Sequence, residues 1–195
     1  MANAPLDTSL FDRAVAFALR AHAGTERRGK GFPYIIHPME AAEIVATITP
    51  DQELLSAAVL HDTVEDTDVT VGDIRREFGD RIASVVEAET DSLSPGMDEA
   101  ASWHDRKQKA IDRLKGAPRD VKIVALGDKL SNMRAIARDY AIKGDGLWKI
   151  FHVSDKAEHR WRFMALRDAL GELDGTFAYK EFENLINQVF DDGTC

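Results

Sequence analysis

Residues 61–66, HDTVED, bring a histidine and three carboxylates together within six positions. Side chains four apart share a helix face, which pairs His61 with Glu65 and Asp62 with Asp66. The apolar run LLSAAVL precedes them, so they stand at the C-terminal end of an expected helix, where the helix dipole disfavours carboxylates. A nearby cation would reverse that penalty and the mutual repulsion. The alternative is that these residues form a solvated acidic helix end. We interpret Asp68 in this way, as a solvated residue at the start of a loop.

Two residues from distant parts of the chain have the chemistry to join this cluster. His37 lies in YIIHPM, just before an expected helix start, and Asp128 lies in the apolar segment IVALGDKLSNM. A lone buried histidine is often only a core residue, but a buried carboxylate must be paired, coordinated or protonated. Neither Lys122 nor Lys129 is an obvious partner for Asp128, since both can be solvent-facing charges and Lys129 is expected to point elsewhere.

Together these residues predict a divalent metal site with mixed nitrogen and oxygen ligands. The candidate ligands are His37, His61, Asp62 and Asp128. Carboxylate-rich ligation with imidazole suits Mn²⁺ or Fe²⁺, and Zn²⁺ stays open as an alternative.

The overall charge makes one basic segment informative. The chain has 195 residues and a formal net charge of −9, which disfavours nucleic acid and anionic membranes as partners. Against that background ERRGKG, residues 26–31, is a tight basic cluster that could neutralise a phosphorylated ligand. The alternative for this segment is a solubilising turn.

The bulk properties predict one soluble domain spanning residues 1–195. Hydrophobic residues make up 44% of the chain, and no run approaches the roughly 18 apolar residues of a membrane span. The N-terminal MANAPLDTSLFDRA lacks the features of a signal peptide, and Cys195 is the only cysteine, so we expect a cytoplasmic protein without disulfides. The oligomeric state is not indicated.

Helical patterns dominate, and they predict an all-α domain of eight to ten helices. Asp51 is an expected N-cap, Thr70 with Asp73 forms a capping-box pattern, and Gly79 and Pro118 are expected helix boundaries. Residues 67–71 alternate like a strand but are too short for a sheet, and 92–98 are an expected loop. The expected helices cover residues 9–22, 38–49, 52–66, 71–78, 81–90, 103–116, 118–140, 145–171 and 177–190.

The order of these motifs resembles the HD superfamily of metal-dependent phosphohydrolases. Three segments are similar, more narrowly, to the hydrolase domain of RelA/SpoT proteins, which degrade the alarmone (p)ppGpp. They are RRGKGFPYIIHP, AAVLHDTVEDTDVTVGDIRREFGDRIASVVEAETD and ALGDKLSNMRAI. The resemblance covers residues 8–170. Because 195 residues are too few for the further domains of the long family members, the chain resembles the small stand-alone alarmone hydrolases.

The resemblance implies a role for each matching residue. It makes His37, His61, Asp62 and Asp128 the ligands of Mn²⁺. It makes Glu65 and Asp66 the pair that activates or positions the attacking water, and it places Arg27, Arg28 and Asn132 at the nucleotide.

Two departures from the family pattern stand out. No lysine follows Thr90 and Asp91 until Lys107, so Arg106 or Lys107 is the candidate for the phosphate contact that a Thr-Lys motif usually makes. Gly127 stands where an alanine is common before the metal aspartate. In a helix, glycine is less favourable than alanine by about 1 kcal/mol.

The implied activity is hydrolysis of the 3′-pyrophosphate of (p)ppGpp, giving GDP or GTP and pyrophosphate. One alternative keeps the metal and changes the substrate to another phosphorylated nucleotide, such as NADPH at its 2′-phosphate. A second is a nucleotide-binding sensor, against which the retained Glu65 and Asp66 argue. A purely structural or partner-binding role would leave Asp128 unexplained. We interpret the remaining histidines and the three tryptophans as structural.

Overall fold

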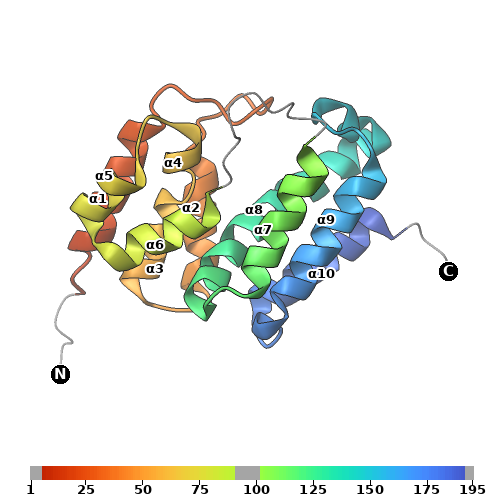
Figure 1. Cartoon of the computed structure of the whole chain (residues 1–195). Coiled ribbons are helices and arrows are strands. Elements are labelled where there is room, and N and C mark those ends of the chain that lie inside the picture. The colour runs from red at the N-terminus through yellow and green to blue at the C-terminus, as the bar shows by residue number, and fades with distance from the viewer. Residues whose placement is uncertain (1–5, 91–101, 192–195) are drawn as a thin grey trace. The chain divides into compact units, whose positions relative to one another are not determined.

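The computed structural model describes residues 6–90 and 102–191, and over these residues the protein is built from α-helices (Figure 1). The expected loop at 92–98 lies outside the described residues. The α-helices are α1 (Ser9–Ala21), α2 (Ile36–Ala46), α3 (Gln52–Leu60), α4 (Thr63–Asp66), α5 (Val71–Phe78), α6 (Asp80–Glu89), α7 (Trp103–Lys115), α8 (Arg119–Lys143), α9 (Lys156–Ala169) and α10 (Phe177–Phe190). Two 3₁₀ helices, Gly144–Ile150 and Gly171–Leu173, complete them.

The predicted all-α class is confirmed. Within the described ranges no strand forms, and the one extended pairing is an isolated antiparallel bridge between Glu26 and Pro33. No helix in these ranges is long and apolar enough to cross a membrane. The chain divides into two compact units, Met1–Thr90 and Asp91–Cys195, each of which is described separately below. The single domain over residues 1–195 stays a prediction.

The first unit is organised around α3. This helix packs against α1, α2 and α6, and α5 packs against α6 (Figure 1). Small side chains make the close packing possible: Ala57 and Ala58 of α3 and Ala14 and Ala18 of α1 are all fully buried. Because α3 lies at the centre of its unit, the residues at its C-terminal end are held among buried neighbours.

Several helix boundaries in this unit follow the sequence signals. Asp51 accepts a hydrogen bond from the Glu53 amide as the N-cap of α3. Thr70 and Asp73 form the predicted capping box of α5, and Gly79 ends that helix with φ of +91°, a conformation that favours glycine. Other boundaries differ from the prediction by one to three residues, since α2 spans Ile36–Ala46 and not 38–49, and α6 spans Asp80–Glu89 and not 81–90.

The expected single helix over residues 52–66 is interrupted. Helix α3 ends at Leu60 and α4 begins at Thr63, with His61 and Asp62 in the turn between them. At the break, side chains donate hydrogen bonds to backbone carbonyls. The Thr63 hydroxyl donates to the Leu60 oxygen, and His61 Nδ1 donates to the Ala58 oxygen, both at 2.7 Å. Side-chain bonds of this kind compete with the helical ladder, which is why the apolar periodicity did not predict the break.

The second unit is built on the 25-residue helix α8. Helix α10 packs against α8 and α9, and α7 packs against α9 (Figure 1). Trp148, Phe163 and Phe190 are buried in its core, where the Phe163 and Phe190 rings stack. The expected helix at 145–171 is shorter than predicted, because residues 144–150 form a 3₁₀ helix and α9 begins only at Lys156, after the N-cap Asp155.

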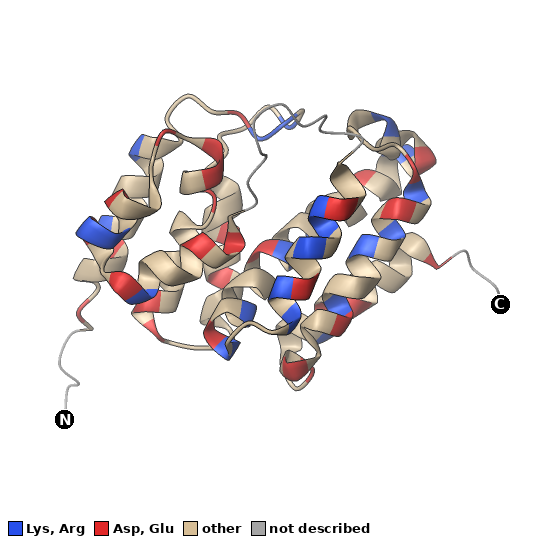
Figure 2. Cartoon of the chain, viewed as in Figure 1, with Lys and Arg blue, Asp and Glu red and all other residues tan. Residues whose placement is uncertain are grey.

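The charges of the second unit lie mainly on its exposed surfaces. Figure 2 shows Lys and Arg alternating with Asp and Glu along α7 and α9. Pairs such as Lys115 with Asp112, at 3.2 Å, are exposed and contribute little to stability. These helices therefore fold chiefly through their buried apolar faces.

Candidate metal centre

His61 is held in one orientation by the end of α3. Its side chain is buried, and its Nδ1 lies 2.7 Å from the carbonyl oxygen of Ala58. Because a carbonyl can only accept a hydrogen bond, Nδ1 carries a proton, and Nε2 is the nitrogen through which the neutral ring can bind a metal. A backbone partner on one ring nitrogen is the usual way in which a protein orients a metal-binding histidine.

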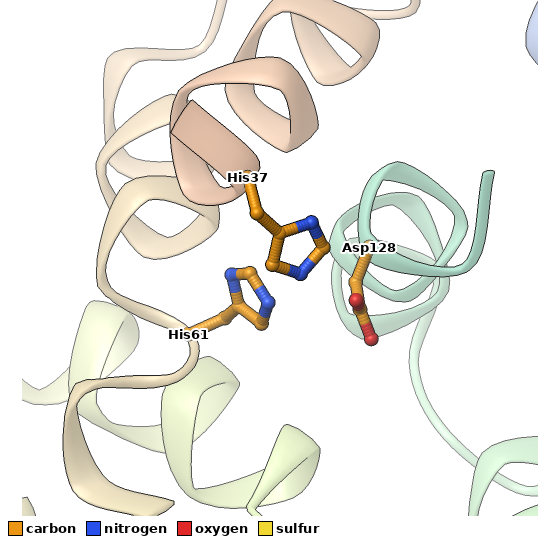
Figure 3. A group of neighbouring side chains, drawn as sticks. All are labelled: His37, His61 and Asp128. Atoms are coloured by element: carbon orange, nitrogen blue, oxygen red, sulfur yellow. The ribbon is translucent and has the colours of Figure 1, made fainter. Parts of the chain in front are cut away.

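His37 approaches the same place from the first turn of α2. It is also buried, and its ring centre lies 5.2 Å from that of His61. The ligand nitrogens of the two histidines lie within 4.8 Å of one another. Figure 3 shows the rings of His37 and His61 pointing toward each other.

Both histidines converge on one oxygen of Asp62. Nε2 of His61 lies 3.0 Å and Nε2 of His37 lies 3.4 Å from Oδ2 of Asp62. A nitrogen lone pair facing an anionic oxygen is unfavourable unless a proton or a cation stands between them. Two imidazoles and a carboxylate that converge in this way have the donor chemistry of a divalent transition-metal site, so the residues of the first unit fit such an ion.

Tyr34 supplies a contact to this cluster that the sequence did not reveal. Its hydroxyl donates a hydrogen bond of 2.6 Å to Oδ2 of Asp62. Burial, and then the charge and hydrogen bond of Asp62, raise the pKa of Tyr34. The hydroxyl is therefore a proton donor throughout the physiological range. The partners are 28 residues apart, and no local spacing signals such a bond.

Glu65 and Asp66 lie on the short helix α4, directly after the cluster. Both side chains are exposed, and the Asp66 amide bonds to the Asp62 carbonyl at 2.9 Å, which keeps the two aspartates on one helical turn. Asp66 also lines an open hollow of about 540 Å³ together with Phe17, Asp68 and Asp73. The pair is thus accessible to solvent, as residues that handle a water proton must be.

Asp128 is buried on α8 and is bonded within its own helix. Lys129 Nζ and Asn132 Nδ2 each lie 2.5 Å from one of its two carboxylate oxygens. The prediction that Lys129 points away from Asp128 was wrong, because its long side chain folds back along the helix to pair with the buried carboxylate. The expectation that Asn132 shares a helix face with Asp128 is confirmed.

Apart from Asn132, the predicted substrate residues lie in a loop of the first unit and on α7 of the second. Arg27 is half-buried, with its guanidinium carbon 5.3 Å from the centre of the Tyr34 ring, whereas Arg28 is exposed. Their loop is closed by backbone bonds, among them the Arg27 amide to the Phe32 oxygen at 3.0 Å. Lys107 is half-buried on α7 in the second unit.

The other histidines differ in their surroundings. His22 follows α1, where the sequence favours a cation, yet burial lowers its pKa and favours the neutral ring. His159 is buried and His152 and His104 are exposed. His104 bonds to Glu158 at 2.7 Å and stacks on Trp161, in agreement with a structural role.

Known proteins similar to this chain were then compared with it. The model of the HD domain family matches residues 14–149, more than half of the chain. A human guanosine-3′,5′-bis(diphosphate) 3′-pyrophosphohydrolase is 38% identical over 129 residues, which cover 64% of this chain and 68% of that protein. Its zebrafish (Danio rerio) counterpart is 34% identical over 135 residues, covering 67% of this chain and 71% of that protein.

Longer relatives share only this segment. A guanosine-3′,5′-bis(diphosphate) 3′-pyrophosphohydrolase of Aquifex aeolicus is 35% identical over 138 residues, which are 70% of this chain but 19% of that protein. The chain therefore spans about a fifth of the length of that relative.

Two solved structures share the fold. The first is described as a metazoan ortholog of SpoT that hydrolyzes ppGpp. It matches with a TM-score of 0.72 and 24% identity, and the match covers 96% of this chain and 98% of that chain. The second, lmo0812 from Listeria monocytogenes, has a TM-score of 0.68 at 27% identity over 83% of this chain and 98% of its own.

Proposed function

The chain belongs to the HD domain family, and on that premise we propose that it is a metal-dependent hydrolase of (p)ppGpp. The reaction adds water across the bond between the 3′ oxygen and its pyrophosphate, so that ppGpp gives GDP and pyrophosphate, and pppGpp gives GTP and pyrophosphate. The human and zebrafish relatives support this substrate, since each carries that activity in its name and two thirds or more of each is covered.

The observation that carries the proposal is the convergence of His37 and His61 on one oxygen of Asp62. We propose that these residues, with Asp128 of the second unit as the fourth, are the ligands of the ion. Asp128 is supported by its burial and by the family match, whose range includes it. Mn²⁺ is the proposed metal, because two imidazoles with two carboxylates suit it.

Such an ion, when bound, would polarise a phosphate oxygen and lower the pKa of a water molecule. Glu65 and Asp66 would do the proton chemistry. One of them accepts the proton of the attacking water, and the better base is whichever carboxylate does not ligate the ion, because a bound cation depresses a carboxylate pKa. Their exposure on α4 supports this role.

The substrate's negative charge requires cations near the site. We propose that Arg27 and Arg28 attract the phosphates, with Lys107 of α7 as a further phosphate contact. We propose that Asn132 contacts the nucleotide. The role of Arg27 and Arg28 is supported by the basic composition of their segment, residues 26–31, in a chain whose net charge is −9. We propose a cytoplasmic location, because a chain whose only cysteine is Cys195 needs no oxidising compartment to form disulfides within it.

A substrate panel tests this function. The purified chain, freed of metal and reloaded with Mn²⁺, is given ppGpp, NADPH and GTP in separate reactions, and kcat/KM is measured for each. We expect ppGpp to be turned over with the highest kcat/KM. Turnover of NADPH alone, with release of orthophosphate, would move the assignment to a 2′-phosphatase, and binding of ppGpp without turnover would indicate a sensor.

A further inference from the structure

Asp62 is held by a hydrogen bond from outside the ligand set. The Tyr34 hydroxyl donates to Oδ2 of Asp62 at 2.6 Å, and the two histidine Nε2 atoms approach that same oxygen. A hydrogen bond of this length to a carboxylate is strong, and it fixes the direction in which the carboxylate faces. The partners that orient a metal ligand in this way set metal affinity nearly as much as the ligand itself.

The Tyr34 ring is in turn held by its neighbours. Its backbone amide donates to the Thr25 carbonyl at 2.9 Å. The His22 ring lies 4.9 Å from the Tyr34 ring, centre to centre, with an angle of 37° between the planes, and the Arg27 guanidinium lies 5.3 Å from the Tyr34 ring centre. These contacts restrict the orientation in which the phenol presents its hydroxyl to Asp62.

His22 is unusual among these neighbours. It is 4% exposed, and neither of its ring nitrogens makes a hydrogen bond within the part of the chain that the structure describes. Its backbone is fixed, because its amide donates to the Ala18 carbonyl at the end of α1. A buried polar group without such a bond is destabilising, so an apolar side chain of similar shape would pack there at lower free energy. The His22 ring contacts the Tyr34 ring, whose hydroxyl in turn bonds to Asp62.

We propose that Tyr34 is a positioning residue that orients Asp62 for metal binding, and that His22 acts on the same site through the Tyr34 ring. This inference rests on the proposed metal-dependent function. It adds a chain of contacts from the end of α1 to Asp62 that lies outside the four proposed ligands.

The first test removes only the hydroxyl. Tyr34→Phe keeps the ring and its contacts, so we expect an unchanged thermal melt of the metal-free protein. The dissociation constant for Mn²⁺, measured by electron paramagnetic resonance of the free ion, should rise by about 10- to 100-fold. Tyr140→Phe is the matched control, since Tyr140 donates to Asp145 at 3.1 Å in the second unit, and it should bind Mn²⁺ as the wild type does.

The second test asks whether His22 acts through Tyr34. His22→Ala should weaken Mn²⁺ binding in the wild-type background, and His22→Phe, which restores a ring, should recover most of the loss. In the Tyr34→Phe background His22→Ala should have little further effect, because the hydroxyl that it positions is already gone. The thermal melt of each variant separates this outcome from a general loss of folding.

The possible outcomes separate the inference from the function beneath it. Wild-type affinity for Mn²⁺ in Tyr34→Phe, while the wild type itself binds Mn²⁺ and hydrolyses ppGpp, would overturn the inference alone. An equal effect of His22→Ala in both backgrounds would overturn the role of His22. A wild-type chain that binds no Mn²⁺ would overturn both the inference and the proposed function.

Discussion

Nε2 of His61 lies 3.0 Å from Oδ2 of Asp62, its immediate neighbour in the sequence. The two residues form the turn between α3 and α4. Within this turn the two side chains of the HD pair converge. The hydrogen bond from His61 Nδ1 to Ala58 leaves Nε2 as the atom that faces Asp62.

The first prediction concerns His61 itself. His61→Gln keeps a polar side chain but removes the imidazole, and we expect Mn²⁺ affinity to fall by more than about 100-fold, beyond the usual effect of losing a partner outside the ligand set. Metal content after dialysis, measured by mass spectrometry, checks this. His104→Gln, which changes an exposed histidine of α7, should keep its metal. Equal metal content in the two variants would exclude His61 as a ligand.

Asp128 offers a test of the fourth ligand. Asp128→Asn preserves the shape of the side chain and removes its charge, so metal content and ppGpp turnover should both fall to near background. Asp139→Asn, on the same helix and paired with Lys143 at 3.4 Å, serves as the control and should behave like the wild type. A metal-loaded Asp128→Asn protein would remove Asp128 from the ligand set. A thermal melt checks for destabilisation from the Lys129 charge left behind.

The exposed carboxylates of α4 should separate catalysis from metal binding. Glu65→Gln and Asp66→Asn should each keep their metal, and the variant that lacks the general base should lose about 10²- to 10⁴-fold in kcat. Glu77→Gln, an exposed glutamate of α5, should leave kcat unchanged. If both α4 variants turn over ppGpp at nearly the wild-type rate, neither carboxylate is the base.

Stability should fall in acid because of buried histidines. Burial lowers the pKa of His159, and its Nε2 donates to the Val153 carbonyl at 2.7 Å. Above the ordinary histidine pKa of 6.5 neither the folded nor the unfolded chain binds this proton. Below 6.5 the unfolded chain binds it first, so the free energy of unfolding decreases as pH falls, by up to about 1.4 kcal/mol per pH unit.

Urea unfolding between pH 7.5 and 5.0, in the presence of a chelator, measures this effect. His159→Gln keeps a side-chain donor for Val153 and cannot ionise, so its stability should decline less steeply over this range than that of the wild type. Identical slopes for the two proteins would show that His159 does not carry the acid sensitivity. Burial also lowers the pKa of His22, so part of the decline should persist in the variant.

Local spacing and chemistry predicted most of the helices and the core of the site. The capping box at Thr70 and the stop at Gly79 are short-range signals that depend on backbone conformation alone, and the structure reproduces them. The convergence of His61 with Asp62 followed from their residue types and from the family resemblance. The identities of the bound ion and the substrate stay predictions of that resemblance.

The features that sequence analysis missed depend on contacts that no local pattern encodes. The bond from Tyr34 to Asp62 links the turn before α2 to the turn between α3 and α4, and periodicity describes one helix at a time. The pairing of Lys129 with Asp128 depends on a flexible side chain folding back over a buried charge. The lowered pKa of His22 depends on burial, which its place in the sequence does not show.

The products of ppGpp hydrolysis test the central claim most directly. Phosphorus nuclear magnetic resonance of the Mn²⁺-loaded wild-type chain with ppGpp should show GDP and pyrophosphate appearing in equal amounts, and a chelator should abolish both signals. Orthophosphate as the product, or equal turnover with and without the chelator, would contradict a metal-dependent 3′-pyrophosphohydrolase.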